Sequence, residues 1–237
     1  MPAKLAIAAA LIACCGAAFG LGEDQLYTGD ARTVRPGGLQ LQAAYRGAFG
    51  EGARVGGASL TVGATPSMDV KLSYGYLWSY SGTNYRIGPS IGAKWRFVGD
   101  GQTEPSVALS GLCASRQRSG DPPSKADFGA LLIFQQPTPV GTVLVNVGRV
   151  FVGENVPDLR YLAAALARRV TPHVLVAAQY IDVDQFGQGV PGREFSMWVG
   201  AVVYHPNKST GYSMQIGYTP EAVQAHWNAT LGIGLYF

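Results

Sequence analysis

Charged residues and cysteines are scarce in this sequence. Asp, Glu, Lys and Arg make up 14% of its 237 residues, against about 25% in soluble domains, which is too little charge to cover an ordinary soluble surface. Two of the three cysteines, Cys14 and Cys15, fall in an apolar N-terminal stretch, so Cys113 has no internal partner. We expect no disulfide framework, and because no His or Cys spacing suits a metal, we expect neither a metal nor a cofactor.

The first 20 residues have the composition of a secretory signal peptide. Lys4 precedes an uncharged run of Leu, Ala, Ile and Cys, and the small residues around 18–20 supply a cleavage site. Two alternatives stay open, namely an N-terminal anchor helix and a lipoprotein signal in which Cys14 is acylated. Without residues 1–20 the net charge is 17 − 15 = +2, which is too small to indicate a nucleic-acid partner.

Glycine is abundant, with 32 residues, and 14 prolines accompany it. Prolines recur near positions 36, 66, 105, 138, 172 and 206, and the intervals up to position 237 are 30, 39, 33, 34, 34 and 31 residues. Because proline has no N–H to give to a strand interior, these sites predict turns. Six intervals of similar length indicate one supersecondary unit repeated six times.

Each interval contains two runs in which apolar residues alternate with polar or small ones. The clearest is 69–80, where Val70 and Leu72 occupy one parity while Lys71 and Ser73 occupy the other. Such alternation predicts β-strands with one apolar face. Twelve strands in six hairpins are expected, over about residues 38–49, 55–65, 69–80, 85–97, 105–115, 127–136, 141–151, 159–170, 173–183, 194–204, 211–219 and 226–237.

Alternating runs of about ten residues are typical of outer-membrane β-barrels. Since the bilayer core offers no water to satisfy backbone groups, the strands must close on one another without a free edge. The sequence therefore predicts an all-β protein, in which residues 37–237 form a closed antiparallel transmembrane β-barrel in a bacterial outer membrane. Proline-marked turns should face the periplasm, and longer outer loops are expected over residues 116–125, 184–193 and 219–224.

Two other interpretations of the same pattern are weaker. Residues 128–148 carry no charge and are long enough for a transmembrane helix, but Gln135, Gln136, Pro137 and Pro139 lie within them. A soluble β-sandwich or lipocalin-like barrel would place polar residues on its outward parity. The outward parity of these runs is instead the more apolar one, which favours contact with lipid.

The outward parity defines the expected contacts with the membrane. Ten Tyr and Trp residues, including Tyr76, Trp78 and Tyr161, are assigned to it, as expected for an aromatic girdle at headgroup level. The expected partners are outer-membrane lipid, lipopolysaccharide and the barrel-insertion machinery. The last nine residues resemble the signal which that machinery reads, since outward apolar residues alternate up to a final Phe, namely Leu231, Ile233, Leu235 and Phe237.

The inward parity defines the lumen. Basic residues dominate it in the first four strands and recur in the eighth, which predicts a cationic wall that favours anions. The alternative is that these side chains pair with inward acids and carbonyl groups and only brace the barrel. The candidate selectivity wall consists of Arg46, Lys71, Arg86, Lys94, Arg96 and Arg160.

Strands five to ten carry large apolar residues on the inward parity, which a plain water-filled pore does not need. These residues either line an apolar path or pack against a plug. Residues 21–36, which precede the first strand, form a periplasmic lead or a small plug of this kind. The candidate apolar lining consists of Leu131, Ile133, Leu144, Leu162 and Trp198.

No arrangement of residues indicates catalysis. A barrel lipase or deacylase needs a nucleophile beside a base, and His226 with Ser196 or Ser213 is the combination that proximity suggests. We therefore expect no enzyme but a channel or transporter for the passive passage of small hydrophobic or anionic solutes. A structural or adhesive barrel with a packed lumen is the alternative, and a lipid-modifying enzyme at the rim is a third.

One stretch resembles a known family. Residues 26–45, LYTGDARTVRPGGLQLQAAY, are similar to the opening of outer-membrane proteins of the phenol meta-cleavage-pathway family, in which a Thr- and Asp-rich lead precedes a Pro-Gly and the first strand. Members of that family are regarded as channels for hydrophobic or aromatic nutrients. The resemblance implies the same barrel and a transport function, and it transfers no individual site residue.

Overall fold

Twelve β-strands make up most of the chain. The computed structural model describes residues 28–48, 54–78, 84–118, 126–151, 158–186, 194–220 and 226–237, and the expected signal peptide lies outside these ranges. Among the described residues, no helix is long and apolar enough to cross a membrane. The strands are β1 (Leu39–Ala48), β2 (Arg54–Thr65), β3 (Met68–Trp78), β4 (Tyr85–Val98), β5 (Ser106–Arg118), β6 (Ala126–Thr138), β7 (Gly141–Phe151), β8 (Asp158–Thr171), β9 (Val174–Phe186), β10 (Glu194–Asn207), β11 (Thr210–Tyr218) and β12 (Trp227–Tyr236).

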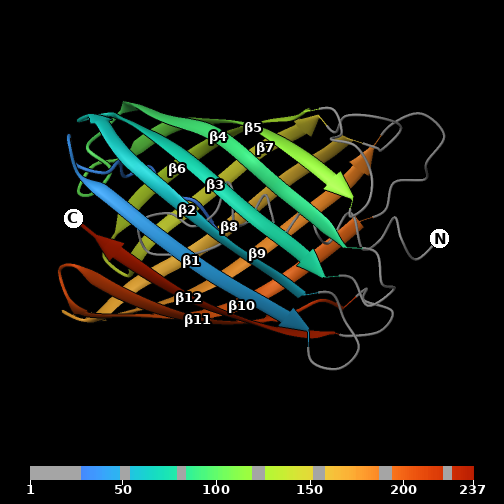
Figure 1. Ribbon diagram of the computed structural model, residues 1–237. Coiled ribbons are helices and arrows are strands. Elements are labelled where there is room, and N and C mark those ends of the chain that lie inside the picture. Colours follow the sequence, from blue (N-terminus) through green and yellow to red (C-terminus); the bar gives the residue numbers. More distant parts are fainter. Residues whose placement is uncertain are drawn as a thin grey trace.

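The strands form a closed barrel in which each strand runs antiparallel to the next (Figure 1). The first and last strands pair from Gln40 and Tyr236 onward. At the end of this seam the Leu39 N–H donates to the Phe237 carbonyl (3.1 Å), and the Phe237 N–H donates to the Leu39 carbonyl (2.8 Å). Closure leaves no unpaired edge, as a bilayer requires, and the predicted closed antiparallel barrel of twelve strands is confirmed.

The two ends of the barrel differ in their connections. At the left-hand end of Figure 1, residues 66–67, 139–140, 172–173 and 208–209 each join two strands in a tight turn, and residues 99–105 form a longer one. Strand β1 begins at this end of the barrel, and strand β12 ends there. Short turns are characteristic of the periplasmic side. The predicted outer loops belong to the opposite end, and residues 119–125, 187–193 and 221–225 fall outside the described part of the chain.

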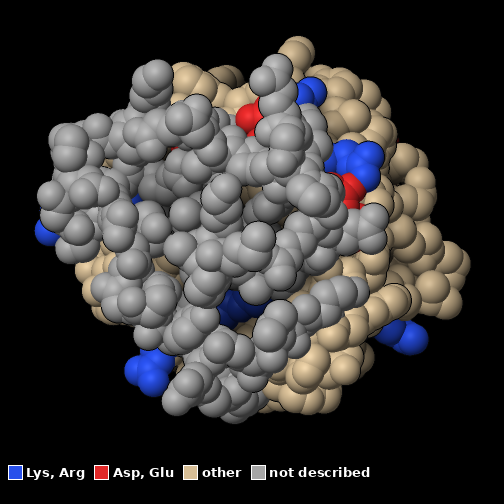
Figure 2. Space-filling view, turned by 90° about the vertical axis from the view of Figure 1, so that its right-hand side faces the viewer, with Lys and Arg blue, Asp and Glu red and all other residues tan. Residues whose placement is uncertain are grey.

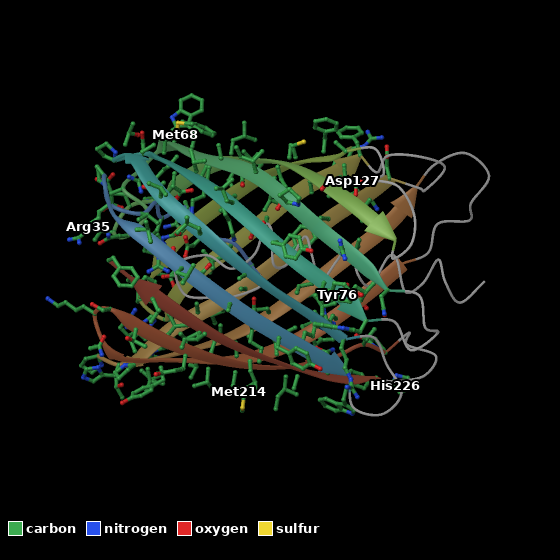
Figure 3. All side chains as sticks on the ribbon, in the orientation of Figure 1. Arg35, Met68, Tyr76, Asp127, Met214 and His226 are labelled. Atoms are coloured by element: carbon green, nitrogen blue, oxygen red, sulfur yellow. The ribbon has the colours of Figure 1, made fainter. Side chains whose placement is uncertain are left out.

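Side chains alternate between the lumen and the outer face, as the pleat of a strand dictates. On β3, Leu72 and Tyr74 are each 50% exposed on the outside, whereas Leu77 is fully buried inside. Figure 3 shows Met214 pointing away from β11 on the outer face. Tyr161 was expected among the outward aromatic residues, but it is buried in the lumen wall of β8, so that expectation is wrong.

Deleting Phe237 is expected to impair insertion more than it changes transport by barrels already folded. The deletion removes both backbone hydrogen bonds to Leu39 and an outward ring that is 61% exposed. Two bonds of about 1 kcal/mol each correspond to roughly a tenfold or greater loss of folded barrel. The measurement is the heat-modifiable form in the outer-membrane fraction, and Phe237→Tyr is the control that should insert normally. Normal insertion of the deletion variant would show that this residue is not part of the signal.

Candidate functional site

The wall of the lumen is divided into a polar half and an apolar half. The polar half consists of six neighbouring strands, from β11 through β12 and β1 to β4. Buried uncharged polar side chains occur on the inward parity of five of these strands, namely β11, β12, β1, β2 and β4. The buried ones are Gln40, Gln42, Ser59, Thr61, Ser90, Ser213, Gln215, Asn228 and Thr230.

The apolar half consists of the remaining strands, β5 to β10. Its inward side chains form two clusters of buried apolar residues, one of which gathers near the periplasmic turns around Leu175 and Val203. Three of the five residues predicted for the apolar lining, Leu131, Ile133 and Leu144, belong to this wall, and each is at most 3% exposed.

Leu162 and Trp198 were also expected in the lining, but they lie on the outer face of the barrel. Their exposed fractions are 41% and 60%, and the Trp198 ring lies 4.7 Å from that of Tyr180 on the outer face. The prediction for both residues is wrong because β8 and β10 carry apolar residues on both faces. Alternation then does not distinguish the inside from the outside, and on β8 the small side chains of Ala163 and Ala165 are the buried ones.

The polar half also holds four of the six basic residues that were predicted for the wall. Two buried acids, Asp69 on β3 and Asp127 on β6, face the same lumen. These six side chains together contribute 4 − 2 = +2 charges to the wall. The four basic residues are Arg46 on β1, Lys71 on β3, and Lys94 and Arg96 on β4.

Arg86 lies on the outer face because a β-bulge changes the parity of β4. Within residues 87–90, two residues of β4 stand opposite one residue of β3, so the residues before the bulge change sides. Arg86 consequently pairs with the outward Tyr76. Gly88 permits the bulge, since its φ of 109° is a conformation that other residues rarely adopt. The assignment of Arg86 to the lumen is therefore wrong.

Arg160 lies on the outer face as well, so its assignment to the lumen wall is also wrong. Its side chain is 68% exposed and forms an ion pair with Asp184 of the neighbouring strand. Arg149, which is its partner in the β7–β8 ladder, pairs with Asp158 at 3.3 Å. Both pairs lie toward the end of the barrel that Figure 2 views, where Lys and Arg side chains are spread around the circumference. These outward arginines are neutralised by carboxylates.

Residues 28–33 lie inside the barrel, against the apolar half. Three amide side chains interrupt that wall, and all of them are at most 5% exposed. Buried amides need hydrogen-bond partners, and the backbone of this N-terminal segment supplies them. The bonds run from the Thr28 N–H to Gln179 Oε1 (2.9 Å), from the Ala31 N–H to Gln135 Oε1 (2.9 Å), and from Asn146 Nδ2 to the Gly29 carbonyl (3.1 Å).

Asp30 carries the segment's contact with the polar half. Its Oδ2 lies 2.7 Å from Nη2 of Arg32, and its Oδ1 lies 3.8 Å from Nζ of Lys94. The same ammonium group lies 3.6 Å from Asp69. A buried carboxylate is costly unless it is paired, and Asp30 is only 4% exposed. The segment is therefore held from both sides of the lumen.

Beyond these contacts the segment leaves the lumen along β2 at the periplasmic end. The Gly37 N–H donates to the Gly63 carbonyl (2.9 Å), and the Gly63 N–H donates to the Gly38 carbonyl (3.0 Å). A Cβ at Gly63 would lie 2.1 Å from the Arg35 carbonyl oxygen. Only glycine allows the two backbones to approach this closely.

The longest periplasmic turn, residues 99–105, also reaches the segment. The Thr103 hydroxyl and the backbone N–H groups that follow Asp100 donate to its carboxylate, and they hold the pKa of that carboxyl below its usual range. In the turn so organised, Gly101 accepts a hydrogen bond from Gln135 Nε2 (2.6 Å) and has a φ of 77°. The turn thus contributes to the amide network that holds the segment.

Two of the basic wall residues brace the barrel. Arg96 donates to the Pro66 carbonyl at the periplasmic end (2.7 Å). Arg46 donates across the lumen to the Met197 sulfur of β10 (3.2 Å). Lys71 and Lys94, which lie diagonally across β3 and β4, form the centre of the cationic wall.

His226, which was considered as a catalytic base, has ordinary contacts. His226 Nδ1 lies 3.0 Å from the Thr219 carbonyl, and its ring stacks on Tyr218 with centroids 5.9 Å apart. In the part of the chain that the structure describes, no three His, Cys, Asp or Glu residues come together in a way that suits a metal ion.

Known proteins resemble this chain in fold alone. No family model and no curated protein matches the sequence. The KdgM porin in complex with disordered oligogalacturonate superposes with a TM-score of 0.59 at 9% identity, covering 84% of this chain and 99% of that one. The COG4313 outer membrane channel from Pseudomonas putida F1 gives 0.59 at 10% identity, covering 88% and 98%. The translocator domain of the autotransporter NalP from Neisseria meningitidis gives 0.51 at 11%, covering 84% and 88%.

These similarities establish the fold of outer-membrane barrels. Porins and autotransporter translocators share that fold, so it does not by itself identify a function. The resemblance to the phenol meta-cleavage-pathway family stays a prediction.

Proposed function

We propose that this protein is a channel of the bacterial outer membrane for the passive passage of small solutes. The observation that supports the proposal is the division of the lumen into a polar, cationic half and an apolar half. An adhesive or scaffolding barrel needs no such division. The fitting solutes are anionic or hydrophobic, and a molecule with both properties contacts both halves at once.

The two halves act on different parts of such a solute. Lys71 and Lys94 attract a carboxylate, because a lumen with low-dielectric walls focuses the field of a few charges. Leu131, Ile133 and Leu144 offer an apolar surface to the remainder of the molecule. Weak contacts at several positions favour passage, since a solute that binds tightly at one site leaves slowly.

We infer that the N-terminal segment, residues 28–33, acts as a plug in this channel. It occupies the periplasmic part of the lumen, and its Asp30 carboxylate lies beside Lys94, where an incoming carboxylate is attracted. A solute anion can therefore compete with Asp30 for the same cation. Passage requires that the segment shift, and solute binding to Lys94 favours that shift.

The structural neighbours support a channel without specifying a solute. One is described as a porin in complex with oligogalacturonate and another as an outer membrane channel. We propose the outer membrane as the location of this protein, and residues 1–20 as its export signal.

A structural barrel with a packed lumen is the second candidate. It is favoured by the burial of Ile133, Ile181 and Met197, which are at most 1% exposed inside the barrel. Conductance distinguishes the two candidates, because a packed barrel carries no current.

The test is single-channel conductance in planar bilayers, with reversal potentials measured in a salt gradient. We expect an ion current that prefers anions. The double variant Lys71→Gln/Lys94→Gln removes two positive charges from the wall, and it should shift the anion-to-cation permeability ratio about threefold or more toward unity. Arg86→Gln is the control, since it removes one positive charge from the outer face and should leave the ratio unchanged.

Two results would contradict the proposal. The absence of current and of solute uptake would favour the packed barrel. An equal loss of anion preference in the Arg86→Gln control would show that total charge, and not the wall, sets selectivity.

A further inference from the structure

The outer face of β1 to β4 carries two arginines near the end opposite the periplasmic turns. Arg54 begins β2, and Arg86 lies beside the bulge of β4. Both are exposed. Along β1 to β4, no described residue that faces outward is Asp or Glu. This surface therefore carries positive charge near the end of the barrel opposite the short turns, without a carboxylate among its described residues.

Aromatic rings lie between the two arginines. Arg54 is the ladder partner of Trp78, and Arg86 is the ladder partner of Tyr76. The Tyr76 and Trp78 ring centroids are 4.8 Å apart, and that of Tyr45 lies 6.3 Å from Trp78. Figure 3 places Tyr76 near the end of β3 that adjoins the outer connections. Tyr and Trp rings favour the headgroup region of a bilayer.

The rings of Tyr45, Tyr76 and Trp78 form an aromatic platform, and a glycine, Gly56, lies beneath two of them. A Cβ at Gly56 would lie 3.2 Å from the Trp78 ring and 3.6 Å from the Tyr45 ring. The absence of a side chain at this position allows the two rings to lie low over the sheet. The three rings form an aromatic surface in which Trp78 is tilted by 52° to Tyr45 and by 49° to Tyr76, and Arg54 and Arg86 lie on the strands to either side of β3.

Below the platform the same face is apolar. Leu72, Tyr74 and Ile91 are between 50% and 55% exposed, as expected for side chains that meet acyl chains. Arg54 and Arg86 lie about 12 Å apart on the sheet, since two strand spacings of about 4.8 Å separate β2 from β4 and their ladder partners on β3 are two residues apart. The face thus presents two anion-binding groups above a surface for acyl chains.

We propose that this face binds lipopolysaccharide through its lipid A, a disaccharide that carries one phosphate at each end and several acyl chains. The two guanidinium groups bind the two phosphates, Trp78 and Tyr76 contact the sugar rings, and Leu72 and Ile91 contact the acyl chains. Arginine suits this role because its planar fork matches the oxygens of a phosphate. Because the two arginines are positively charged, their charge favours the binding of a phosphorylated glycolipid over that of a neutral lipid.

The opposite side of the same rim provides a matched control. Arg149 and Arg160 also lie on the outer face, but Asp158 and Asp184 pair with them. A phosphate approaching that side meets two carboxylates. Removing these two arginines takes away the same formal charge without removing the proposed site.

The experiment uses the full barrel refolded in a zwitterionic detergent and titrated with bisphosphoryl lipid A, with binding measured by native mass spectrometry. We expect monophosphoryl lipid A to bind about tenfold more weakly, and inorganic phosphate at millimolar concentration not to bind. Arg54→Gln/Arg86→Gln should weaken binding of the bisphosphoryl form by about tenfold or more, whereas Arg149→Gln/Arg160→Gln should bind it like the unchanged protein. Heat-modifiable mobility reports folding, and the single variants Arg54→Gln and Arg86→Gln, with about threefold effects, replace the double variant if it does not fold.

Three outcomes would overturn the proposal. These are unchanged binding in Arg54→Gln/Arg86→Gln, equal losses in the two double variants, and equal affinity for the two forms of lipid A. Binding of inorganic phosphate with the same dependence on Arg54 and Arg86 would show a simple anion site in place of a lipid site. The channel proposal is tested separately, because conductance in bilayers without lipopolysaccharide should not change in the Arg54→Gln/Arg86→Gln variant.

Discussion

Replacing Gln135, Asn146 and Gln179 with leucine should raise single-channel conductance severalfold. Each of these buried amides holds one backbone group of the N-terminal segment. Once the amides are gone, the freed N–H and carbonyl groups of the segment lie against an apolar wall. Each lost bond of this kind costs about 1–3 kcal/mol.

The sum of these losses is large enough to change the state of the lumen. Three bonds correspond to roughly 3–9 kcal/mol, and about 5.5 kcal/mol moves a population from 99:1 to 1:99. The segment should therefore leave the barrel in most molecules. The leucines add apolar surface to a wall that is already apolar, so the barrel itself should stay folded.

The control for this experiment is Ser59→Ala. Ser59 is buried in the lumen wall of β2, on the polar half, and it lies away from the three amides. The conductance of the Ser59→Ala variant should equal that of the unchanged protein. In the triple leucine variant, conductance could stay unchanged while a cysteine placed in residues 28–33 becomes reactive to a thiol reagent. This result would show that the segment leaves without opening a path. Conductance and reactivity that both stay unchanged would show that the amides do not hold the segment.

Gly63→Val should release the segment at its other end. A Cβ at this position would lie 2.1 Å from the carbonyl oxygen of Arg35 and 2.5 Å from that of Val34. Because backbone atoms cannot yield as a flexible side chain can, the segment must move off β2. Valine itself suits a strand, so the pairing of β2 with β1 and β3 should persist.

Limited proteolysis measures this release. Trypsin should cleave after Arg32 or Arg35 in the folded Gly63→Val barrel about tenfold faster or more than in the unchanged protein, since loss of roughly 1.4 kcal/mol of holding energy exposes the segment ten times more often. Gly111→Val is the matched control, because a Cβ there meets nothing within 4 Å. Equal cleavage rates in the two variants would show that the close approach at Gly63 does not fix the segment. Gly63→Ala offers a milder change if the valine variant does not fold.

The barrel could be predicted from the sequence because each of its determinants is local. Prolines such as Pro66 and Pro172 mark turns at nearly equal intervals, and each interval contains two alternating runs. The structure has a strand for every run, and its bounds lie within a few residues of the expected ones. Closure then follows from the bilayer, which tolerates no free edge.

The inside and outside of single strands were predictable only where the two faces differ in polarity. On β3 and β4 the lysines Lys71 and Lys94 mark the lumen correctly. On β8 leucines and alanines occur on both faces. Arg160 was therefore assigned to the lumen, although its side chain lies on the outer face. The bulge at Gly88 moved Arg86 outward, and nothing in the alternation of β4 shows where a bulge falls.

The contacts of residues 28–33 could not be predicted, because they join positions far apart in the sequence. A usable signal was nevertheless present. Gln135, Asn146 and Gln179 are polar residues on the inward parity of otherwise apolar strands. A buried amide in such a place needs a partner, and the chain that precedes β1 is close enough to supply one. Asp30 carries no comparable signal, since an acidic residue in a lead segment is ordinarily solvated.

The position of the β1–β12 seam has a consequence for assembly. All other ladders join strands that follow one another in the sequence, whereas the seam joins the first strand to the last and must form late. The seam lies within the polar half, so the interior surface that stays open longest is lined by Gln40, Gln42, Asn228 and Thr230. Water can hydrate these side chains until the final strand docks. The apolar strands β5 to β10 can meanwhile associate as one curved sheet. In the partly folded protein the apolar interior surface then lies away from the open seam.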